Sequence, residues 1–305
     1  MINVLTGKQF ADKSLIEKIF KRARELQDAD AKRKAPKLLS GKVVATVFYE
    51  TSTRTRLSFE SGALKLGAGI ISIADPKTSS ASKGESLEDA IKVISGYSDV
   101  IVLRHPENGA AEKAASVSNV PIINAGDGFN EHPTQALYDL YTIEKELGKI
   151  DGLKIAFLAD LRYQRNVHSL IPIFTLFKNL QLYFIGPKEL ALPQIYKDQL
   201  IRARIKFKEL ENVDEILPNI DVLYVARVFK ERFSDETEYE RLKKSFFVDK
   251  NTLAKMKKNS IILHVMPRIF EIDKEVDADP RAAYFRQAKN GLYVRMALLL
   301  YALGL

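Results

Sequence analysis

Hydroxyl and guanidinium side chains follow one another in the segment Ser52-Thr53-Arg54-Thr55-Arg56. An apolar run at residues 43–48 precedes this segment and predicts a buried strand, and residues 53–66 are predicted to form a helix. The first turn of a helix presents unbonded amide N–H groups and the positive end of the helix dipole, and an arginine can donate two parallel hydrogen bonds to an oxyanion. The sequence therefore predicts a phosphate-binding site here, although the P-loop pattern is absent.

Two more groups of hydrogen-bond donors follow predicted strands in the first half of the chain. Arg104 comes directly after a strand predicted at residues 100–103, and His132 and Gln135 open a helix that follows a strand predicted at residues 120–124. Ligands of open α/β sheets bind beyond the carboxyl ends of the strands, where helix N-termini point. We therefore expect the three strand ends to bind one shared anion.

Short apolar strands alternate with helical patterns along the whole chain, which is typical of parallel sheets covered on both faces. In the second half, the predicted strands are residues 154–160, 181–186, 222–226 and 261–265. We expect an α/β protein of two doubly wound domains with parallel sheets and the active site between them. The expected parts are residues 1–147, residues 148–284, and a C-terminal helix, residues 285–305, that packs back on the first domain.

The composition excludes several classes of function. The chain has 305 residues, no cysteine and a formal charge of +8. It therefore has no disulfide, thiolate metal site or cysteine nucleophile, and its four histidines lack metal-ligand spacing, so we predict no metal and no cofactor. The basic residues are spread along the chain and match no nucleic-acid motif. The longest apolar run, residues 296–305, is too short for a membrane span of about 20 residues, and the chain begins without a signal-peptide pattern. We expect a cytoplasmic protein that binds small anions and neither nucleic acid nor a membrane.

Two of the motifs are similar to those of a known family. The segment Ser52-Thr53-Arg54-Thr55 resembles the carbamoyl-phosphate motif of the carbamoyltransferases, and His132-Pro133-Thr134-Gln135 resembles their second motif. The resemblance covers essentially the whole chain and is greatest with the aspartate branch of the aspartate/ornithine superfamily. Further stretches that carry it are KGESLEDAIKVISGYSDVIVLRHP, VLYVARVFKER and GLYVRMALL.

The resemblance implies a role for each motif residue and transfer of the carbamoyl group of carbamoyl phosphate to the amine of L-aspartate, in de novo pyrimidine biosynthesis. The phosphate would be held by Ser52, Thr53, Arg54 and Thr55, and the carbamoyl group by Arg104, His132 and Gln135. The attack of the amine forms an oxyanion that needs preorganised donors, so the catalytic residues would be Arg54, Thr55, Arg104, His132 and Lys83. Because phosphate is a good leaving group, no enzyme nucleophile is required.

The loop at residues 75–85 contains Ser79 and Lys83 and resembles the family segment that enters the active site of a neighbouring subunit. On composition alone, a loop rich in serine and lysine is ordinary solvated chain. The resemblance implies that Ser79 and Lys83 bind carbamoyl phosphate in the adjacent subunit and that Lys83 also contacts aspartate. It therefore implies a homotrimer with shared active sites, and regulatory chains are candidate further partners.

Aspartate is a dicarboxylate, so its site needs cations. Arg165 and Arg227 each follow a predicted strand of the second half and resemble the family's carboxylate-binding arginines, and Met266 and Pro267 correspond to its acceptor loop. Ornithine enzymes carry a His-Cys-Leu-Pro motif at that loop, whereas this chain has no cysteine. Aspartate is therefore the favoured acceptor. The alternatives are another amine such as ornithine and a non-catalytic relative that binds carbamoyl phosphate.

The sequence departs from the aspartate enzymes on the acceptor side. They usually have glutamine where Phe229 stands, a small residue where Gln164 stands, and Pro-Leu where Val265 and Met266 stand. These departures predict normal binding of the donor and weaker or altered use of aspartate, unless the amide of Gln164 replaces the missing one. The resemblance further implies a cis Met266–Pro267 peptide bond, and domain-closure contacts by Glu50, Arg165 and Arg232.

Overall fold

The computed structural model describes residues 2–228, 235–243 and 246–305. The chain divides into two compact units. Unit 1 consists of Met1–Tyr138, His168–Leu170 and Lys289–Leu305, and unit 2 consists of Asp139–Val167 and Ile171–Ala288. Helices α5 (Pro133–Leu147), α6 (Arg165–Phe174) and α10 (Tyr284–Ala302) each contribute residues to both units.

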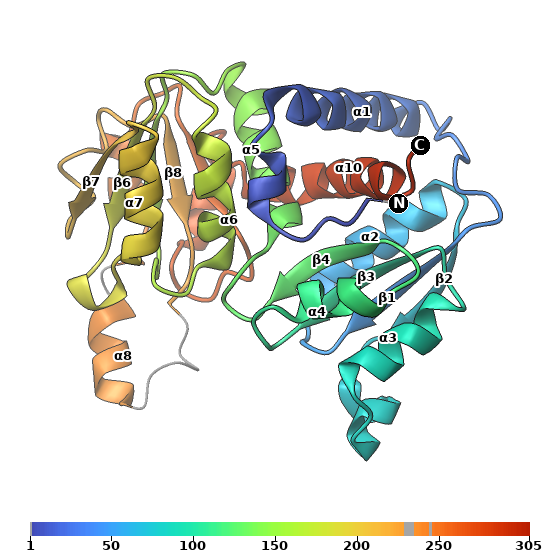
Figure 1. Ribbon diagram of the computed structural model, residues 1–305. Helices are drawn as coiled ribbons and strands as arrows, with labels where there is room; N and C mark the ends of the chain where they lie inside the picture. Colours follow the sequence, from blue (N-terminus) through green and yellow to red (C-terminus); the bar gives the residue numbers. More distant parts are fainter. Residues whose placement is uncertain (1, 229–234, 244–245) are drawn as a thin grey trace. The chain divides into compact units, whose positions relative to one another are not determined.

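Unit 1 is built on a parallel sheet of four strands (Figure 1). The strands are β1 (Val43–Phe48), β2 (Gly69–Ile73), β3 (Val100–His105) and β4 (Ile122–Asp127), in the order β2-β1-β3-β4. The order reverses between β1 and β3, because the chain leaves β1 toward β2 on one side and continues to β3 on the other. Such a reversal opens a crevice at the carboxyl ends of the two central strands, which is where ligands of these folds bind.

Successive side chains of each strand alternate between the two faces of the unit 1 sheet. One face packs its apolar residues, including Ala45, Val47 and Leu103, against α3 (Leu87–Ser95) and α4 (Ala110–Val117). Helices α1 (Lys13–Ala31), α2 (Thr53–Lys65) and the end of α10 lie on the opposite side of the sheet in Figure 1. A Cβ at Gly62 would lie 2.9 Å from Cγ of Met296, so α2 and α10 pack closely there.

Unit 2 has a parallel sheet of five strands in the order β7-β6-β5-β8-β9. The strands are β5 (Lys154–Leu158), β6 (Gln181–Ile185), β7 (Lys206–Leu210), β8 (Val222–Val225) and β9 (Ile261–His264). The remaining helices of the unit are α7 (Gln194–Arg202), α8 (Glu236–Lys243) and α9 (Lys250–Lys255). Here the strand order reverses between β5 and β8, so the predicted site residues that follow these two strands lie at the corresponding crevice.

The predicted fold class, with two parallel α/β sheets, is confirmed. Strand β1 covers the predicted residues, whereas β2 and β7 were not predicted. Both are edge strands in which no residue is fully buried, so they lack the continuous apolar run of a central strand. None of the helices in the described ranges combines the length and the apolar character needed to cross a membrane.

Candidate active site

The N-terminus of α2 follows β1 at the reversal of the unit 1 sheet. Ser52 is its N-cap, with extended backbone angles (φ −159°, ψ 93°), and its hydroxyl makes no capping hydrogen bond to the described residues. By contrast Asp12, Ser86 and Asp249, the N-caps of α1, α3 and α9, accept bonds from amides in the first turn of their helices. The first-turn amides of α2 and the hydroxyl of Ser52 are therefore available together for an anion.

The two arginines in the first turn of α2 differ in their contacts. Arg56 lies 3.3 Å from the carboxylate of Glu60, which also accepts a hydrogen bond from Thr46 of β1. Arg54 is exposed and has no partner among the described residues. Partial desolvation lowers the pKa of Arg54, but an arginine with a usual pKa above about 12 keeps its charge at neutral pH. Arg54 is thus the cation of this helix end that can bind a phosphate.

Arg104, near the end of β3, is held in a fixed orientation. The residue is 8% exposed, and its Nη2 donates to Oε1 of Glu50 at 2.8 Å while Nη1 donates to the carbonyl of Ala125 at 3.2 Å. Glu50 follows β1, so this ion pair joins the two strands that flank the reversal. The structure thus gives Glu50 a role within unit 1, and the expected closure contacts of Glu50 stay a prediction.

His132 and Gln135 lie at the start of α5, after β4. Both are 5% exposed. The amide N–H of His132 donates to Oγ of Ser169 at 2.8 Å, and its ring Nδ1 lies 3.4 Å from Oγ1 of Thr134. The carboxamide of Gln135 accepts a hydrogen bond from the hydroxyl of Tyr138. Because β1, β3 and β4 are adjacent and parallel, the three predicted donor groups lie at one edge of the unit 1 sheet.

Glu131 and Ser169, which support His132, were not predicted. Oε2 of Glu131 accepts the hydroxyl of Ser169 and, at 3.0 Å, the amide of Gly7. Burial raises the pKa of Glu131 to about 7, with a further contribution from the charge of Asp127, while the two hydrogen bonds oppose the rise. A Cβ at Gly7 would lie 2.1 Å from the carbonyl oxygen of Ser169, so only glycine allows this approach. The glutamate that precedes His132 was the one signal in the sequence.

The loop at residues 75–85 forms two short 3-10 helices, Pro76–Thr78 and Ser80–Lys83. The hydroxyl of Ser79 donates to the carbonyl of Pro76 at 2.8 Å. Lys83 is exposed, and its ammonium group has no hydrogen-bond or ion-pair partner in the described part of the chain. Both residues line a hollow of about 550 Å³ together with Tyr49, which directly follows β1.

The predicted acceptor residues of unit 2 lie at its own strand reversal. Arg165 begins α6 after β5, and Arg227 follows β8, and both are partly buried. Gln164, the N-cap of α6, is 3% exposed, makes no side-chain capping bond, and has a buried Oε1 without a hydrogen-bond partner in the described structure. A buried polar atom of this kind is uncommon in native proteins, and this one lies beside the predicted carboxylate-binding arginine.

The loop after β9 carries Met266 and Pro267, and the peptide bond between them is cis, which confirms the prediction. Nδ1 of His264 accepts the amide of Met266 at 2.8 Å, so its Nε2 carries the proton and donates to Oε1 of Glu271 at 2.9 Å. Burial acts most strongly on Glu271 and would raise its pKa, but the hydrogen bond and electrostatic attraction of His264 and the bonds from backbone amides together hold the pKa below its usual value. Oε2 of Glu271 also accepts the amides of residues 269 and 270. The loop is therefore fixed by one buried carboxylate.

A buried network continues from this loop to α6. The amide of His264 donates to Gln287, which donates to Asp139 at 2.7 Å. Asp139 also accepts the hydroxyl of Tyr224, and Asn166 donates to that hydroxyl from the residue after Arg165. The network thus links two segments that the sequence assigned to aspartate. Val265 is partly buried, and Phe229 and Arg232 lie outside the described residues.

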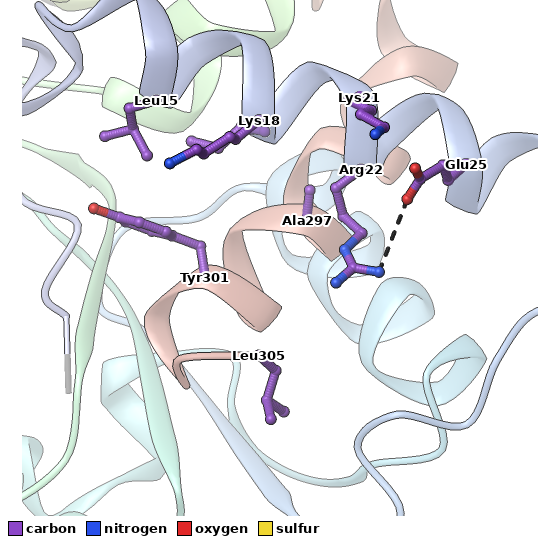
Figure 2. A pocket seen from close by; sticks show the side chains of 9 residues that line it. Leu15, Lys18, Lys21, Arg22, Glu25, Ala297, Tyr301 and Leu305 are labelled. Carbon is purple, nitrogen blue, oxygen red and sulfur yellow. Dashed lines mark ion pairs between the residues drawn. The ribbon is translucent and has the colours of Figure 1, made fainter.

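A second hollow of unit 1, of about 480 Å³, contains none of the predicted site residues (Figure 2). It lies between α1 and the end of α10, with Lys18 and Arg22 on one side and Tyr301 and Leu305 on the other. Arg22 is 3.9 Å from Glu25 of the same helix. The cations of this hollow do not lie at the end of any strand, so it lacks the arrangement that identifies the anion site.

Comparisons with known proteins match the two halves of the chain to two domains of one family. Residues 3–145 match the family model for the carbamoyl-phosphate-binding domain of aspartate/ornithine carbamoyltransferases, and residues 151–302 match the model for the aspartate/ornithine-binding domain. The chain is 50% identical to the aspartate carbamoyltransferase catalytic subunit of Methanocaldococcus jannaschii, over 98% of this chain and 97% of that protein. It is 47% identical to the chloroplastic enzyme of Arabidopsis thaliana, over 97% of this chain and 76% of the relative.

A solved structure extends the similarity to a complex with both substrates. The fold is similar to that of aspartate transcarbamoylase from Trypanosoma cruzi in complex with carbamoyl phosphate and aspartate, with a TM-score of 0.91 and 35% identity. The match covers 97% of this chain and 95% of that chain.

Proposed function

The chain belongs to the aspartate/ornithine carbamoyltransferase family and is an aspartate carbamoyltransferase, and on this premise we propose which of its residues bind each substrate. The enzyme transfers the carbamoyl group of carbamoyl phosphate to the amine of L-aspartate, and the products are N-carbamoyl-L-aspartate and phosphate. The observation that carries the assignment of the donor site is the uncapped N-terminus of α2, with Ser52 and Arg54, at the strand reversal of unit 1.

Carbamoyl phosphate binds with its phosphate at this helix end. The first-turn amides, the hydroxyls of Ser52, Thr53 and Thr55, and the guanidinium of Arg54 together donate to its oxygens. This arrangement uses the helix dipole and charge-assisted hydrogen bonds, both of which favour a dianion. The carbamoyl group then lies toward β3 and α5, where Arg104, His132 and Gln135 are held by their buried contacts.

The amine of aspartate attacks the carbonyl carbon, a C–N bond forms, and the carbonyl oxygen becomes an oxyanion. Arg104, His132 and Thr55 donate hydrogen bonds to that oxygen, and their fixed positions mean that little reorganisation is needed as the charge develops. The C–O bond to phosphate then breaks. We assign the proton of the attacking amine to the departing phosphate, because Glu50, the carboxylate that contacts a donor-site residue, is already bound to Arg104. A large rate loss on removal of a carboxylate near that site would contradict this assignment.

The aspartate carboxylates bind Arg165 and Arg227 in unit 2, with the loop at Met266 and Pro267 beside them. Gln164 supplies an amide to this acceptor site, because its carboxamide is buried and its Oε1 is unpartnered in the described structure. This amide compensates for Phe229, where the aspartate enzymes usually have glutamine. The Michaelis constant for aspartate tests the point, since crowding by Gln164 would raise it.

The loop with Ser79 and Lys83 completes the site of a neighbouring subunit in a homotrimer. The exposed ammonium of Lys83, which has no partner among the residues that the structure describes, supports this proposal. Arg54→Ala and Lys83→Ala proteins are each expected to be inactive, and a mixture of the two regains activity if hybrid trimers contain one site with neither substitution. Mixed trimers that stay inactive would refute sharing.

The absence of cysteine supports a reducing compartment such as the cytoplasm.

A product assay tests the function directly. The purified protein is incubated with carbamoyl phosphate and, separately, with aspartate, ornithine and other amines, and the products are separated. We expect N-carbamoylaspartate with aspartate and no citrulline with ornithine. Formation of citrulline, or of no product with any amine while carbamoyl phosphate still raises the melting temperature, would refute the assignment.

A further inference from the structure

Tyr138 is a buried residue of α5 that contacts Gln135 of the proposed donor site and Arg295 of α10. It is 7% exposed and lies three residues after Gln135, so the two side chains share one face of the helix. Its hydroxyl donates to Oε1 of Gln135. A carboxamide can present either its oxygen or its NH2 group to a ligand, and a donor bound to the oxygen selects one of the two orientations.

The ring of Tyr138 is fixed independently of this hydrogen bond. The guanidinium of Arg295, on α10, lies 4.9 Å from the ring centroid of Tyr138 and 5.2 Å from that of Phe59 on α2. Arg295 also donates to the hydroxyl of Ser58. The cation is thus held between two aromatic rings and attracts both ring faces. It connects Tyr138 to the helix whose first turn forms the phosphate site.

A glycine on α10 provides the space for the ring. A Cβ at Gly291 would lie 3.0 Å and 3.1 Å from Cδ1 and Cε1 of Tyr138. Gly291 lies inside α10, where glycine is less favourable than alanine by about 1 kcal/mol. The close approach of the ring explains the small residue at this position.

We propose that Tyr138 is a positioning residue for the transfer reaction, which acts by fixing the carboxamide of Gln135 toward the carbamoyl group of the donor. The proposal rests on the proposed function of Gln135. Because Oε1 accepts the hydroxyl of Tyr138, the carboxamide is held in the orientation that presents its NH2 group as a donor to the carbonyl oxygen.

The Tyr138→Phe substitution tests the proposal because it removes the hydroxyl and keeps the ring. Tyr293→Phe is the matched control, because it removes the hydroxyl of another buried tyrosine of unit 1. Tyr293 lies on α10, and its hydroxyl donates to Asp30 at 3.0 Å. We expect kcat/KM for carbamoyl phosphate to fall about three- to tenfold in Tyr138→Phe, which corresponds to the loss of one hydrogen bond, and to change less than twofold in Tyr293→Phe. Inhibition by inorganic phosphate, which lacks the carbamoyl group, should change less than twofold in either protein.

A double-mutant cycle separates positioning from a general structural effect. In a Gln135→Ala background, Tyr138→Phe should cause no further loss, because the group that it positions is gone. Gly291→Ala, which displaces the ring, should lower kcat/KM in the wild type and not in that background. An equal fold-loss from Tyr138→Phe in both backgrounds, an unchanged kcat/KM, or an equal loss of phosphate affinity would overturn the proposal. Wild-type turnover with aspartate is measured in the same experiment, so failure of the proposed function is seen separately.

Discussion

The buried carboxyl of Glu131 predicts a pH-dependent loss of stability that one isosteric substitution removes. Its pKa is raised from 4.5 to about 7, chiefly by burial. A carboxyl with a raised pKa binds its proton more tightly in the folded state than in the unfolded state. Stability therefore falls as the pH rises from about 4.5 to about 7, and the full cost is present above that range.

The size of the effect follows from the two pKa values. The interval between 4.5 and about 7 corresponds to at most about 3.5 kcal/mol, at about 1.4 kcal/mol per pH unit. Glu131→Gln keeps an oxygen that can accept the hydroxyl of Ser169 and the amide of Gly7, and it removes the charge. The free energy of unfolding of the variant minus that of the wild type should therefore rise by about 2.5 kcal/mol between pH 5 and pH 8.

Urea unfolding followed by circular dichroism, at one protein concentration, measures this difference at each pH. The groups whose charges or hydrogen bonds act on Glu131 are Asp127, Glu112, Ser169 and Gly7. Asp127 also has a pKa raised by burial, but it is present in both proteins, so the subtraction isolates Glu131. Glu17→Gln, which removes a carboxylate from an exposed position of α1, is the control for the change in net charge.

A difference that stays constant within about 0.5 kcal/mol from pH 5 to pH 8, or that falls with pH, would refute the reasoning. Infrared titration provides a second readout that does not depend on reversible unfolding. The wild type should show a buried carboxylic-acid band that disappears with a midpoint near pH 7, and Glu131→Gln should lack that band.

Three further predictions concern single residues. Arg104→Lys keeps the charge but loses the planar fork that binds Glu50 and Ala125, so kcat should fall by about 10²–10³, measured by steady-state kinetics. Gln164→Ala should raise the Michaelis constant for aspartate at least about threefold, because one hydrogen bond is lost. The Michaelis constant for carbamoyl phosphate should stay within about twofold of the wild-type value. A lower Michaelis constant for aspartate would mean that Gln164 crowds the site. Gly7→Ala should lower the free energy of unfolding, measured in urea, by about 2 kcal/mol or more, because the new Cβ would lie 2.1 Å from the carbonyl oxygen of Ser169. Gly69→Ala is the control: the nearest atoms to its Cβ would be 3.8 Å away, so its free energy of unfolding should be close to that of the wild type.

The central strands, and the position of the proposed donor residues at their carboxyl ends, could be predicted from the sequence because these signals are local. Strand β1 is a short apolar run, and the hydroxyl and guanidinium groups follow it within eight residues of its end. The edge strands β2 and β7 could not be predicted in this way, because neither is a continuous apolar run: Ser72 interrupts β2, and β7 contains three charged residues. The same reasoning applies to the proposed acceptor arginines and their surroundings. Arg227 could be picked out because it directly follows an apolar strand. Asp139 could not, because its hydrogen-bond partners Tyr224 and Gln287 lie 85 and 148 positions further along the chain.

The supporting residues of the donor site were missed for the same physical reason. Ser169 contacts Glu131 across 38 positions, and Arg295 contacts Ser58 across 237. No periodicity or motif reports such pairs, because they form only when the sheet and its helices have packed. Tyr138 was not predicted either, although its spacing of three residues from Gln135 within a predicted helix places the two side chains on one face.

The strand orders of the two units explain why the site cations are where they are. Carbamoyl phosphate and aspartate are both anions, and two anions that must react with each other need separate sets of cations to offset their repulsion. In our proposal each unit supplies one set at its own reversal of strand order: Arg54 and Arg104 near the ends of β1 and β3, and Arg165 and Arg227 beyond β5 and β8. Of these cations, Arg104 is oriented by the carboxylate of Glu50 and the carbonyl of Ala125. The formal charge of +8 is therefore less informative than the placement of four arginines, which selects small anionic metabolites over extended polyanions.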